Sequence, residues 1–253
     1  MPDRPTESAV RLPPALEILW GRRSPGSRGP RAELDVDRIV SAAVDIANAE
    51  GLQAVSMARV AKALGFTTMS LYRHVANKDD LLQLMWNASA RSLADRSLDG
   101  DTWRERLMSW AVIQRQVIEE NIWIVQLPMA TPPLAPNSLA WVELGLSALE
   151  DLDVPAHAKI RVLGLISQHA LIDARMAFDE RRGRALAAEA GVETDYGALV
   201  RELADPEVYP HLTGIVGAEP PPGFEGDDPH AEYAFDIGLI LDGLETLAAR
   251  SGT

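Results

Sequence analysis

The side chains of this chain that could do chemistry gather between residues 67 and 74. Hydroxyl, sulfur, aromatic and basic groups follow one another there: Thr67, Thr68, Met69, Ser70, Tyr72, Arg73 and His74. Groups of this kind bond to phosphate oxygens and meet base edges in the grooves of a duplex. The stretch therefore indicates a surface that contacts nucleic acid.

Catalytic chemistry finds little support elsewhere in the sequence. The chain contains no GxSxG, HExxH or GxGxxG motif, no phosphate-binding GxxxxGK and no cysteine. Its histidines, at positions 74, 157, 169, 211 and 230, lack the spacing of metal ligands. We therefore expect no enzyme activity, no metal site and no cofactor.

Composition indicates a globular protein of one large or two modest domains. The 253 residues are 47% hydrophobic and 24% charged, without cysteine, which fits a reducing cytosol. No apolar run reaches the ~18 residues of a membrane helix, and no signal peptide is recognisable, so we expect a cytoplasmic protein without a membrane partner. The net charge is −13, but residues 1–78 hold 11 Lys+Arg against 8 Asp+Glu, a balance of +3. The first third is thus the part suited to a polyanion.

Two short helices separated by a tight turn position the candidate residues. Apolar residues recur at helical spacing from position 36, and Gly51 ends this first helix. A second helix follows Ser56 and stops at Gly65, where glycine tolerates a left-handed backbone. A third is predicted over residues 67–74 and a fourth over 78–95. This layout is that of a helix-turn-helix, whose second helix enters the major groove.

The rest of the chain also has a helical pattern, so the predicted fold class is all-α, with about nine or ten helices. Thr102 and Glu105 form a capping box before a helix over 103–118. Further helices are predicted over 137–150, from 155 to at least 178, and over 231–250. The stretch 160–172 is apolar on nearly every side and should be buried, whereas residues 205–229, with six prolines and four glycines, suggest a long loop.

Residues 1–33 form a basic extension that we expect to be mostly flexible, because its Pro, Gly and Arg content leaves little to bury. Its apolar island, residues 16–20, suits a short helix that docks on the body. The basic remainder is either a linker or an arm that touches phosphates.

The run VSMARVAKALGFTTMSLYRHVANKDDLL, residues 55–82, resembles the DNA-binding signature of the TetR (tetracycline repressor) family. The preceding residues 39–56 resemble the first helix and link of that family. The resemblance implies a DNA-binding domain over 34–95 and a ligand-sensing and dimerisation domain over 96–253. It favours a repressor that binds a palindromic operator and is released by a small molecule.

The resemblance also implies roles for single residues. Thr67, Thr68 and Met69 occupy the start of the recognition helix, where bases are chosen. Positions that commonly touch the DNA backbone correspond to Ser56, Tyr72, His74 and Lys78. Arg59 and Arg73 either reach a phosphate or remain solvated surface charges. Tyr72 and His74 also have structural alternatives, as a core aromatic and a helix end.

The C-terminal part resembles the family more loosely, over residues 121–152 and 233–247. The resemblance implies a homodimer joined through residues 156–178 and 231–250. It places a largely apolar effector among the middle helices, where each candidate has core packing as its alternative: Trp110, Gln114, Trp123, Met129, Trp141, His169, Asp173 and Met176. The metal-chelating histidine of the tetracycline repressor corresponds to Ala94, which argues against tetracycline with magnesium.

Two whole-chain hypotheses follow. In the first, effector binding shifts the fourth helix and changes the spacing of two recognition helices that must lie ~34 Å apart on the duplex. In the second, the chain is a helical module that binds a small molecule or a partner without DNA. DNA binding that weakens as salt rises would favour the first hypothesis over the second, because contacts with DNA phosphates release counterions.

Overall fold

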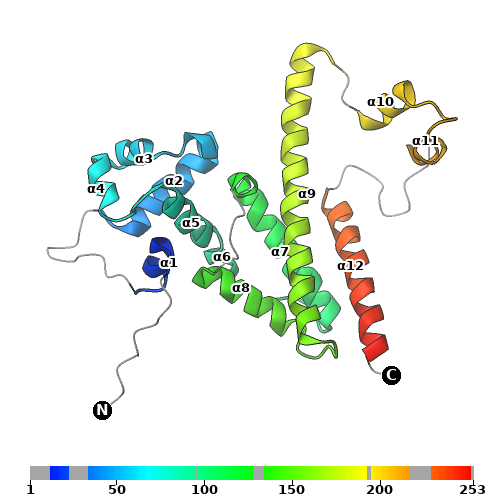
Figure 1. Ribbon diagram of the computed structural model, residues 1–253, viewed down its shortest axis with the longest axis horizontal. Coiled ribbons are helices and arrows are strands. Elements are labelled where there is room, and N and C mark those ends of the chain that lie inside the picture. The colour runs from blue at the N-terminus through cyan, green and yellow to red at the C-terminus, as the bar shows by residue number, and fades with distance from the viewer. Residues whose placement is uncertain are drawn as a thin grey trace. The chain divides into compact units, whose positions relative to one another are not determined.

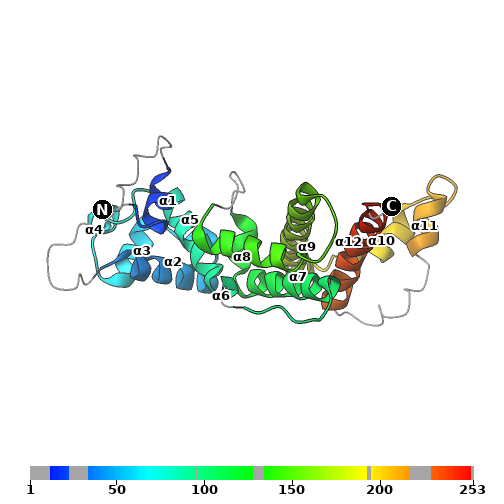
Figure 2. The ribbon, with the colours of Figure 1, turned by 90° about the horizontal axis from the view of Figure 1, so that it is seen from below.

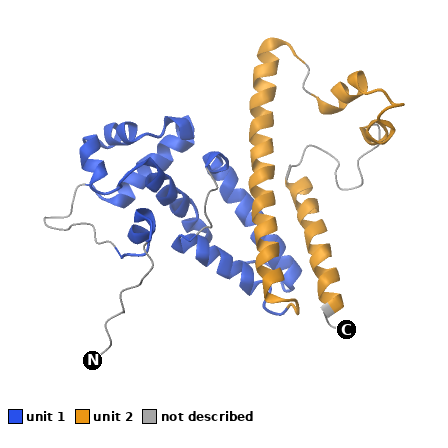
Figure 3. Cartoon of the chain, in the orientation of Figure 1, with its two compact units in different colours: residues 1–151 blue, residues 152–253 orange. Residues whose placement is uncertain are grey.

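The computed structural model describes residues 12–22, 34–94, 96–127, 134–192, 195–216 and 229–251. These residues form twelve α-helices and two short 3-10 helices, with no strand among them, which confirms the all-α class. The chain divides into two compact units, residues 1–151 and residues 152–253 (Figure 3). The predicted functional division at residue 95 lies inside the first unit and stays a prediction. None of the described helices combines the length and the apolar character that crossing a bilayer requires.

The predicted helix-turn-helix is present in the first unit (Figure 1). Helix α2 (Val36–Glu50) begins at Asp35, whose carboxylate accepts the backbone N–H of Arg38, and η1 (Leu52–Ala54) leads from it to α3 (Met57–Leu64). Gly65 then adopts the left-handed conformation, with φ of 77° and ψ of 23°, and its N–H closes the end of α3. This turn delivers the chain to α4 (Thr68–Tyr72).

Helix α4 is shorter than the predicted 67–74. Thr67 is its N-cap, and Arg73 and His74 form the turn that follows. The backbone N–H groups of His74 and Val75 both bond to the carbonyl of Leu71, which closes the helix within five residues.

The predicted fourth helix over 78–95 is wrong in its length, because it divides into α5 (Lys78–Ser89) and α6 (Arg91–Ala94). At the break, serine hydroxyls donate hydrogen bonds to backbone carbonyls: Ser89 Oγ donates to the carbonyl of Trp86 at 2.8 Å. Ser92 Oγ likewise donates to the carbonyl of Ser89 at 3.4 Å. Such local bonds compete with the helical ladder, and they favour an end at Ala90.

The described part of the first unit contains three further α-helices and a second 3-10 helix. Helix α1 (Pro14–Leu19) lies beside α5 in both views (Figures 1 and 2). Helix α7 (Trp103–Glu120) starts with the predicted capping box, and η2 (Ile122–Gln126) follows it. Helix α8 (Pro136–Ser147) packs on both α5 and α6.

The second unit contains α9 (Ala156–Ala190), α10 (Tyr196–Leu203), α11 (Pro210–Val216) and α12 (Pro229–Ser251). Helix α9 packs against α12, and α10 packs against α11. The prediction of one loop over 205–229 is wrong for residues 210–216, which form α11. This helix starts at a proline, a residue suited to the first helical turn. Residues 217–228 lie outside the described part of the chain.

The expected burial of residues 160–172 is only half correct. One side of α9, with Val162, Leu163 and Ile166, is buried. The neighbouring side exposes Leu165 and Ile172 by 51% and 60%. Helix α9 therefore has an apolar side that the single chain leaves exposed to solvent.

Candidate nucleic-acid interface and apolar core

Helix α4 buries one side and shows the other to solvent. Leu71 and Val75 are fully buried, and they fix the helix on the body of the first unit. On the opposite side Met69 is 70% exposed and Tyr72 is 45% exposed. A large apolar side chain held out in water by a rigid short helix suits contact with a base surface such as a thymine methyl group.

Hydroxyl groups fix the start of α4. Thr67 Oγ1 accepts the backbone N–H of Ser70 at 3.3 Å and lies 2.9 Å from Ser70 Oγ. Thr67 is therefore a cap as well as a candidate DNA contact. Thr68 and Ser70 are half-buried, so Met69 and Tyr72 are the outermost members of the predicted set on this helix.

Cationic and polar groups lie at both ends of the helix-turn-helix. Lys78 is exposed in the first turn of α5, and Arg73 is exposed just after α4, whereas His74 is half-buried. Ser56 caps α3: its Oγ accepts the N–H of Arg59 at 3.1 Å, which leaves its hydroxyl proton able to donate to a phosphate.

The guanidinium of Arg59 is paired with a carboxylate. Arg59 Nη2 lies 2.5 Å from Oε1 of Glu50, at the end of α2. Both side chains are partly exposed, so the pair is weak in free energy. To bind a phosphate, Arg59 would have to leave Glu50, and sequence reasoning gave no signal for this competition.

The start of α5 is rigidly capped beside Lys78. Asn77 Oδ1 accepts the N–H of Asp80 at 2.8 Å, and Asn77 Nδ2 donates to Asp80 Oδ2 at 2.9 Å. Asp80 is only 5% exposed. This reciprocal pair sets the direction in which the helix presents Lys78.

Three of the predicted effector contacts are core tryptophans of the first unit. Trp110 and Trp141 stack with ring centroids 5.0 Å apart and planes at 11°, and Trp110 Nε1 donates to the carbonyl of Trp141 at 3.0 Å. Trp123 is fully buried as well. The buried indole N–H groups of Trp123 and Trp141 find no hydrogen-bond partner among the described residues, so each could donate to an acceptor on a ligand.

The other effector candidates are distributed differently. Gln114 is half-buried on α7, and Met129 lies outside the described residues. In the second unit, His169 stacks on Tyr233 at 5.5 Å, and its Nε2 lies 3.1 Å from Oδ2 of Asp236. This contact has the distance of an ion pair but not the alignment of a hydrogen bond.

Two further candidates sit one and two turns along α9 from His169. Asp173 is half-buried and Met176 is 67% exposed. The structure therefore keeps the three candidates of the second unit on one helix.

An open groove of about 850 Å³ borders α7 within the first unit. None of the predicted effector residues within the described part of the chain lines it; its walls include Arg96, Arg104, Met108, Val112 and Gln116. Sequence patterns do not reveal such a groove, because its residues come partly from the segment 96–100 before α7 and partly from α7 itself.

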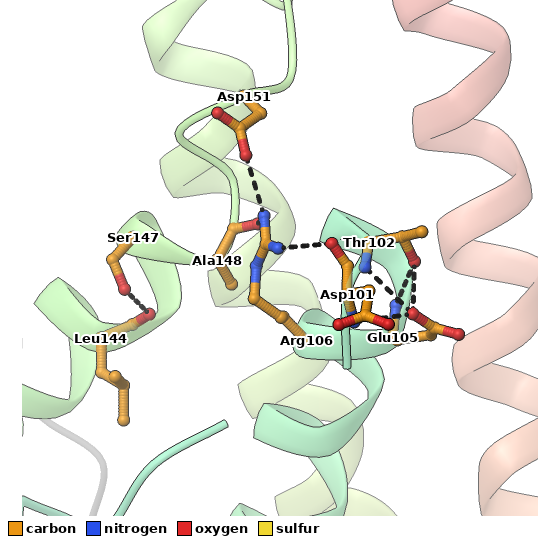
Figure 4. A network of polar contacts seen from close by, with 8 residues as sticks. All are labelled: Asp101, Thr102, Glu105, Arg106, Leu144, Ser147, Ala148 and Asp151. Atoms are coloured by element: carbon orange, nitrogen blue, oxygen red, sulfur yellow. Dashed lines mark hydrogen bonds and ion pairs between the residues drawn. The ribbon is translucent and has the colours of Figure 1, made fainter. Parts of the chain in front are cut away.

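Polar contacts pin the N-terminus of α7 (Figure 4). Arg106 Nη1 donates to the carbonyl of Asp101 at 2.9 Å, and its Nη2 lies 3.2 Å from Asp151 Oδ2. The carboxylate of Glu105 accepts the N–H and the hydroxyl of Thr102 and the N–H of Asp101. These bonds hold the pKa of Glu105 below its ordinary value.

Two sequence families match this chain. Residues 39–85 match the bacterial regulatory proteins of the tetR family, and residues 97–248 match the tetracyclin repressor-like C-terminal domain. The HTH-type transcriptional repressor DrrR1 of Streptomyces coeruleorubidus is 31% identical over 238 residues, which are 93% of this chain and 86% of that protein.

Solved structures share the fold. Apo ActR from Streptomyces coelicolor has a TM-score of 0.70 at 23% identity, covering 87% of this chain and 99% of its own. ActR in complex with actinorhodin has a TM-score of 0.69 at 23% identity, covering 84% and 96%. The exposed helix α4, the C-terminal family match over more than half of the chain and the relative at 31% identity lead to one conclusion. This chain belongs to the TetR family of bacterial transcriptional regulators.

Proposed function

We propose that this protein is a repressor that binds a palindromic operator as a homodimer and is released by a small, largely apolar effector. The observation that carries the proposal is the outward side of α4, where Met69 and Tyr72 are exposed while Leu71 holds the helix in place. A short helix held this way presents its early residues to the major groove.

In this proposal the contacts divide into two groups. Thr67, Thr68, Met69 and Ser70 meet base edges, and they set the operator sequence. The backbone group positions the helix on phosphates and sugars and consists of Ser56, Arg59, Tyr72, Arg73, His74 and Lys78. Backbone contacts fix register without reading sequence, so the two groups have different mutational signatures.

The dimer is proposed from the bare apolar sides of α9 and α12. Leu165, Ile172 and Met176 are exposed on α9, and Phe235 and Leu239 are exposed on α12. The two helices already pack against each other, so their exposed sides belong to one helix pair. A two-fold copy of such a pair covers the same residues on both chains and places two α4 helices symmetrically on a palindrome.

The effector site is proposed among the middle helices. ActR, which shares this fold, binds actinorhodin. In this chain no described residue accepts from the buried N–H groups of Trp123 and Trp141, which suits an apolar ligand that carries a few oxygen atoms. Such a ligand releases DNA only to the extent that it binds the released state more tightly than the DNA-bound state.

A selection of bound duplexes from random oligonucleotides, using the full-length protein, tests the proposal. We expect a two-fold symmetric consensus, bound more weakly as salt rises. A protein that enriches no duplex at low salt would instead be the second candidate, a helical binding module that acts without DNA. That outcome would overturn the proposal, whatever the protein does with small molecules.

A further inference from the structure

Helix α1 lies outside both family matches, which cover residues 39–85 and 97–248. It is nevertheless part of the folded unit. Ala15 is fully buried and Leu16 is 9% exposed, and the helix packs on α5. α5 is the helix that begins with Lys78, next to the recognition helix α4. Helix α1 is therefore in direct contact with the helix that follows the recognition helix.

The end of α1 has a second attachment. Trp20 Nε1 donates to the carbonyl of Leu134 at 3.0 Å, two residues before α8 begins at Pro136. Residues 14–20 therefore bridge two places: the side of α5, by packing, and the entrance of α8, by a hydrogen bond.

Helix α5 meets the start of α8 directly as well. Asn87 and Asn137 bond reciprocally, with Asn137 N donating to Asn87 Oδ1 at 3.1 Å and Asn137 Nδ2 donating to the Asn87 carbonyl at 2.7 Å. Trp86 Nε1 donates to Ser138 Oγ at 3.0 Å. Asn87 and Ser138 are 8% and 6% exposed, so these bonds are shielded from water, and breaking them is costly.

The surroundings of α5 leave it little room to move alone. No residue from Asp80 to Ala90 is exposed, because α2, α8 and α1 all pack on this helix. A displacement of its C-terminal end must therefore either break the bonds to Asn137 and Ser138 or carry the start of α8 along.

We propose that α1 is a regulatory brace that fastens α5 to the start of α8. A change at the DNA-binding helices is then transmitted to residues 134–140, and a change at residues 134–140 is transmitted to the DNA-binding helices. This inference rests on the proposed function for its DNA half. Coupling between two binding events is reciprocal, so if residues near α8 influence DNA binding, DNA must alter residues near α8. The brace can therefore be tested without knowing the effector.

The first test uses the DNA-free, full-length protein and hydrogen–deuterium exchange. Trp20→Phe removes the bond to Leu134 while keeping an aromatic ring, and Leu16→Ala removes packing on α5. We expect exchange to accelerate about three- to ten-fold at residues 84–89 and 134–140, the size that one hydrogen bond supports. Trp103→Phe, on α7, is the matched control and should leave both segments unchanged. Acceleration confined to residues 12–22 would overturn the brace.

The second test adds the operator duplex obtained by selection. In the wild-type protein, DNA should slow exchange in α4 and at the start of α5 and should also change exchange at residues 134–140. In Trp20→Phe the protection of α4 should persist, while the change at 134–140 falls at least three-fold. An equal change in variant and wild type would contradict the transmission. Absence of any protection of α4 in the wild type would instead overturn the proposed function and leave the DNA-free test to decide on the brace.

Discussion

Between residues 67 and 78, side chains that hold the helices alternate with side chains that face solvent. Thr67 and Asn77 accept backbone N–H groups and fix two helix starts, while Leu71 anchors α4 in the core. The side chain of Met69, which lies between them, and that of Lys78, which follows Asn77, are exposed to solvent. We therefore expect a substitution in this segment to change either the position of a helix or one of the proposed contacts with DNA, and measurement can separate the two effects.

Lys78→Ala should weaken binding to every duplex alike, by about tenfold, because an exposed ammonium beside a capped helix start bonds to phosphate without reading sequence. The slope of log K against log salt should fall by about one per subunit. Titrations with the selected operator and with a scrambled duplex at three salt concentrations measure both quantities. Arg201→Ala removes the same charge from α10 and serves as the control; a loss of equal size there would make the effect one of net charge.

Thr68→Ala should change which base is preferred at one position of each half-site. A lost base-edge contact is worth about 1–3 kcal/mol of discrimination. Repeating the duplex selection with the variant measures this, and Thr213→Ala on α11 is the control. A variant that keeps the wild-type consensus but binds all sites weakly would place Thr68 with the backbone contacts and contradict its assignment.

In this segment the sequence predicts local turns and helix starts better than it predicts tertiary contacts. Gly65, Ser56 and Asn77 identify the turn and the helix starts because capping depends on neighbours three residues away. The pair of Arg59 with Glu50 depends on how α2 and α3 cross, and no local spacing encodes it. Residues whose role is set by tertiary geometry are therefore the ones that the sequence leaves open.

At the scale of the helix, local chemistry fixes starts more firmly than ends. The capping box of α7 was predictable because Thr102 and Glu105 satisfy each other's backbone groups. The ends of α4 and α5 were not, because apolar spacing continues past both. A backbone turn at Leu71 and the serine hydroxyls around Ala90 decide them. The junction of Asn87 with Asn137 also escaped prediction, since the two residues are far apart in sequence.

The capping box gives a pH prediction. The bonds from Thr102 and Asp101 lower the pKa of Glu105 from its ordinary 4.5. A depressed carboxyl pKa adds stability that is fully present above the unfolded-state pKa and is lost as pH falls through the folded-state pKa. Glu105→Gln should therefore destabilise the protein at pH 7 and have a smaller effect at pH 3.5.

Urea unfolding at these two pH values measures the change in the free energy of unfolding. Both pH values lie away from the isoelectric point near 4.8, where the protein carries no net charge to keep it dispersed. Glu143→Gln, at an exposed position within α8, is the matched control. If the Glu105 and Glu143 variants differ from wild type equally at both pH values, the capping bonds are not the source of the effect.

At the scale of the whole molecule, the spacing of apolar residues in one sequence does not show what covers an apolar surface. The stretch 160–172 predicts burial, and α9 buries one side of it within its own unit. The other side remains exposed, and periodicity cannot distinguish a core from an interface because both exclude water in the same way. The exposed apolar residues of α9 and α12 are the surface through which we propose that two chains associate.

Leu165→Asp and Leu239→Asp should each convert a dimer into monomers. A large apolar side chain contributes about 1.5–3 kcal/mol when it is buried, and a two-fold interface counts every substitution twice. Helix content should stay unchanged, because Leu165 and Leu239 are 51% and 57% exposed in the single chain. Operator affinity should fall steeply, since each half-site then binds one α4 helix alone. Analytical ultracentrifugation and duplex titration measure the two effects. Leu203→Asp, at an exposed position on α10, should leave both intact; a stable dimer in the α9 and α12 variants would place the subunit contact elsewhere.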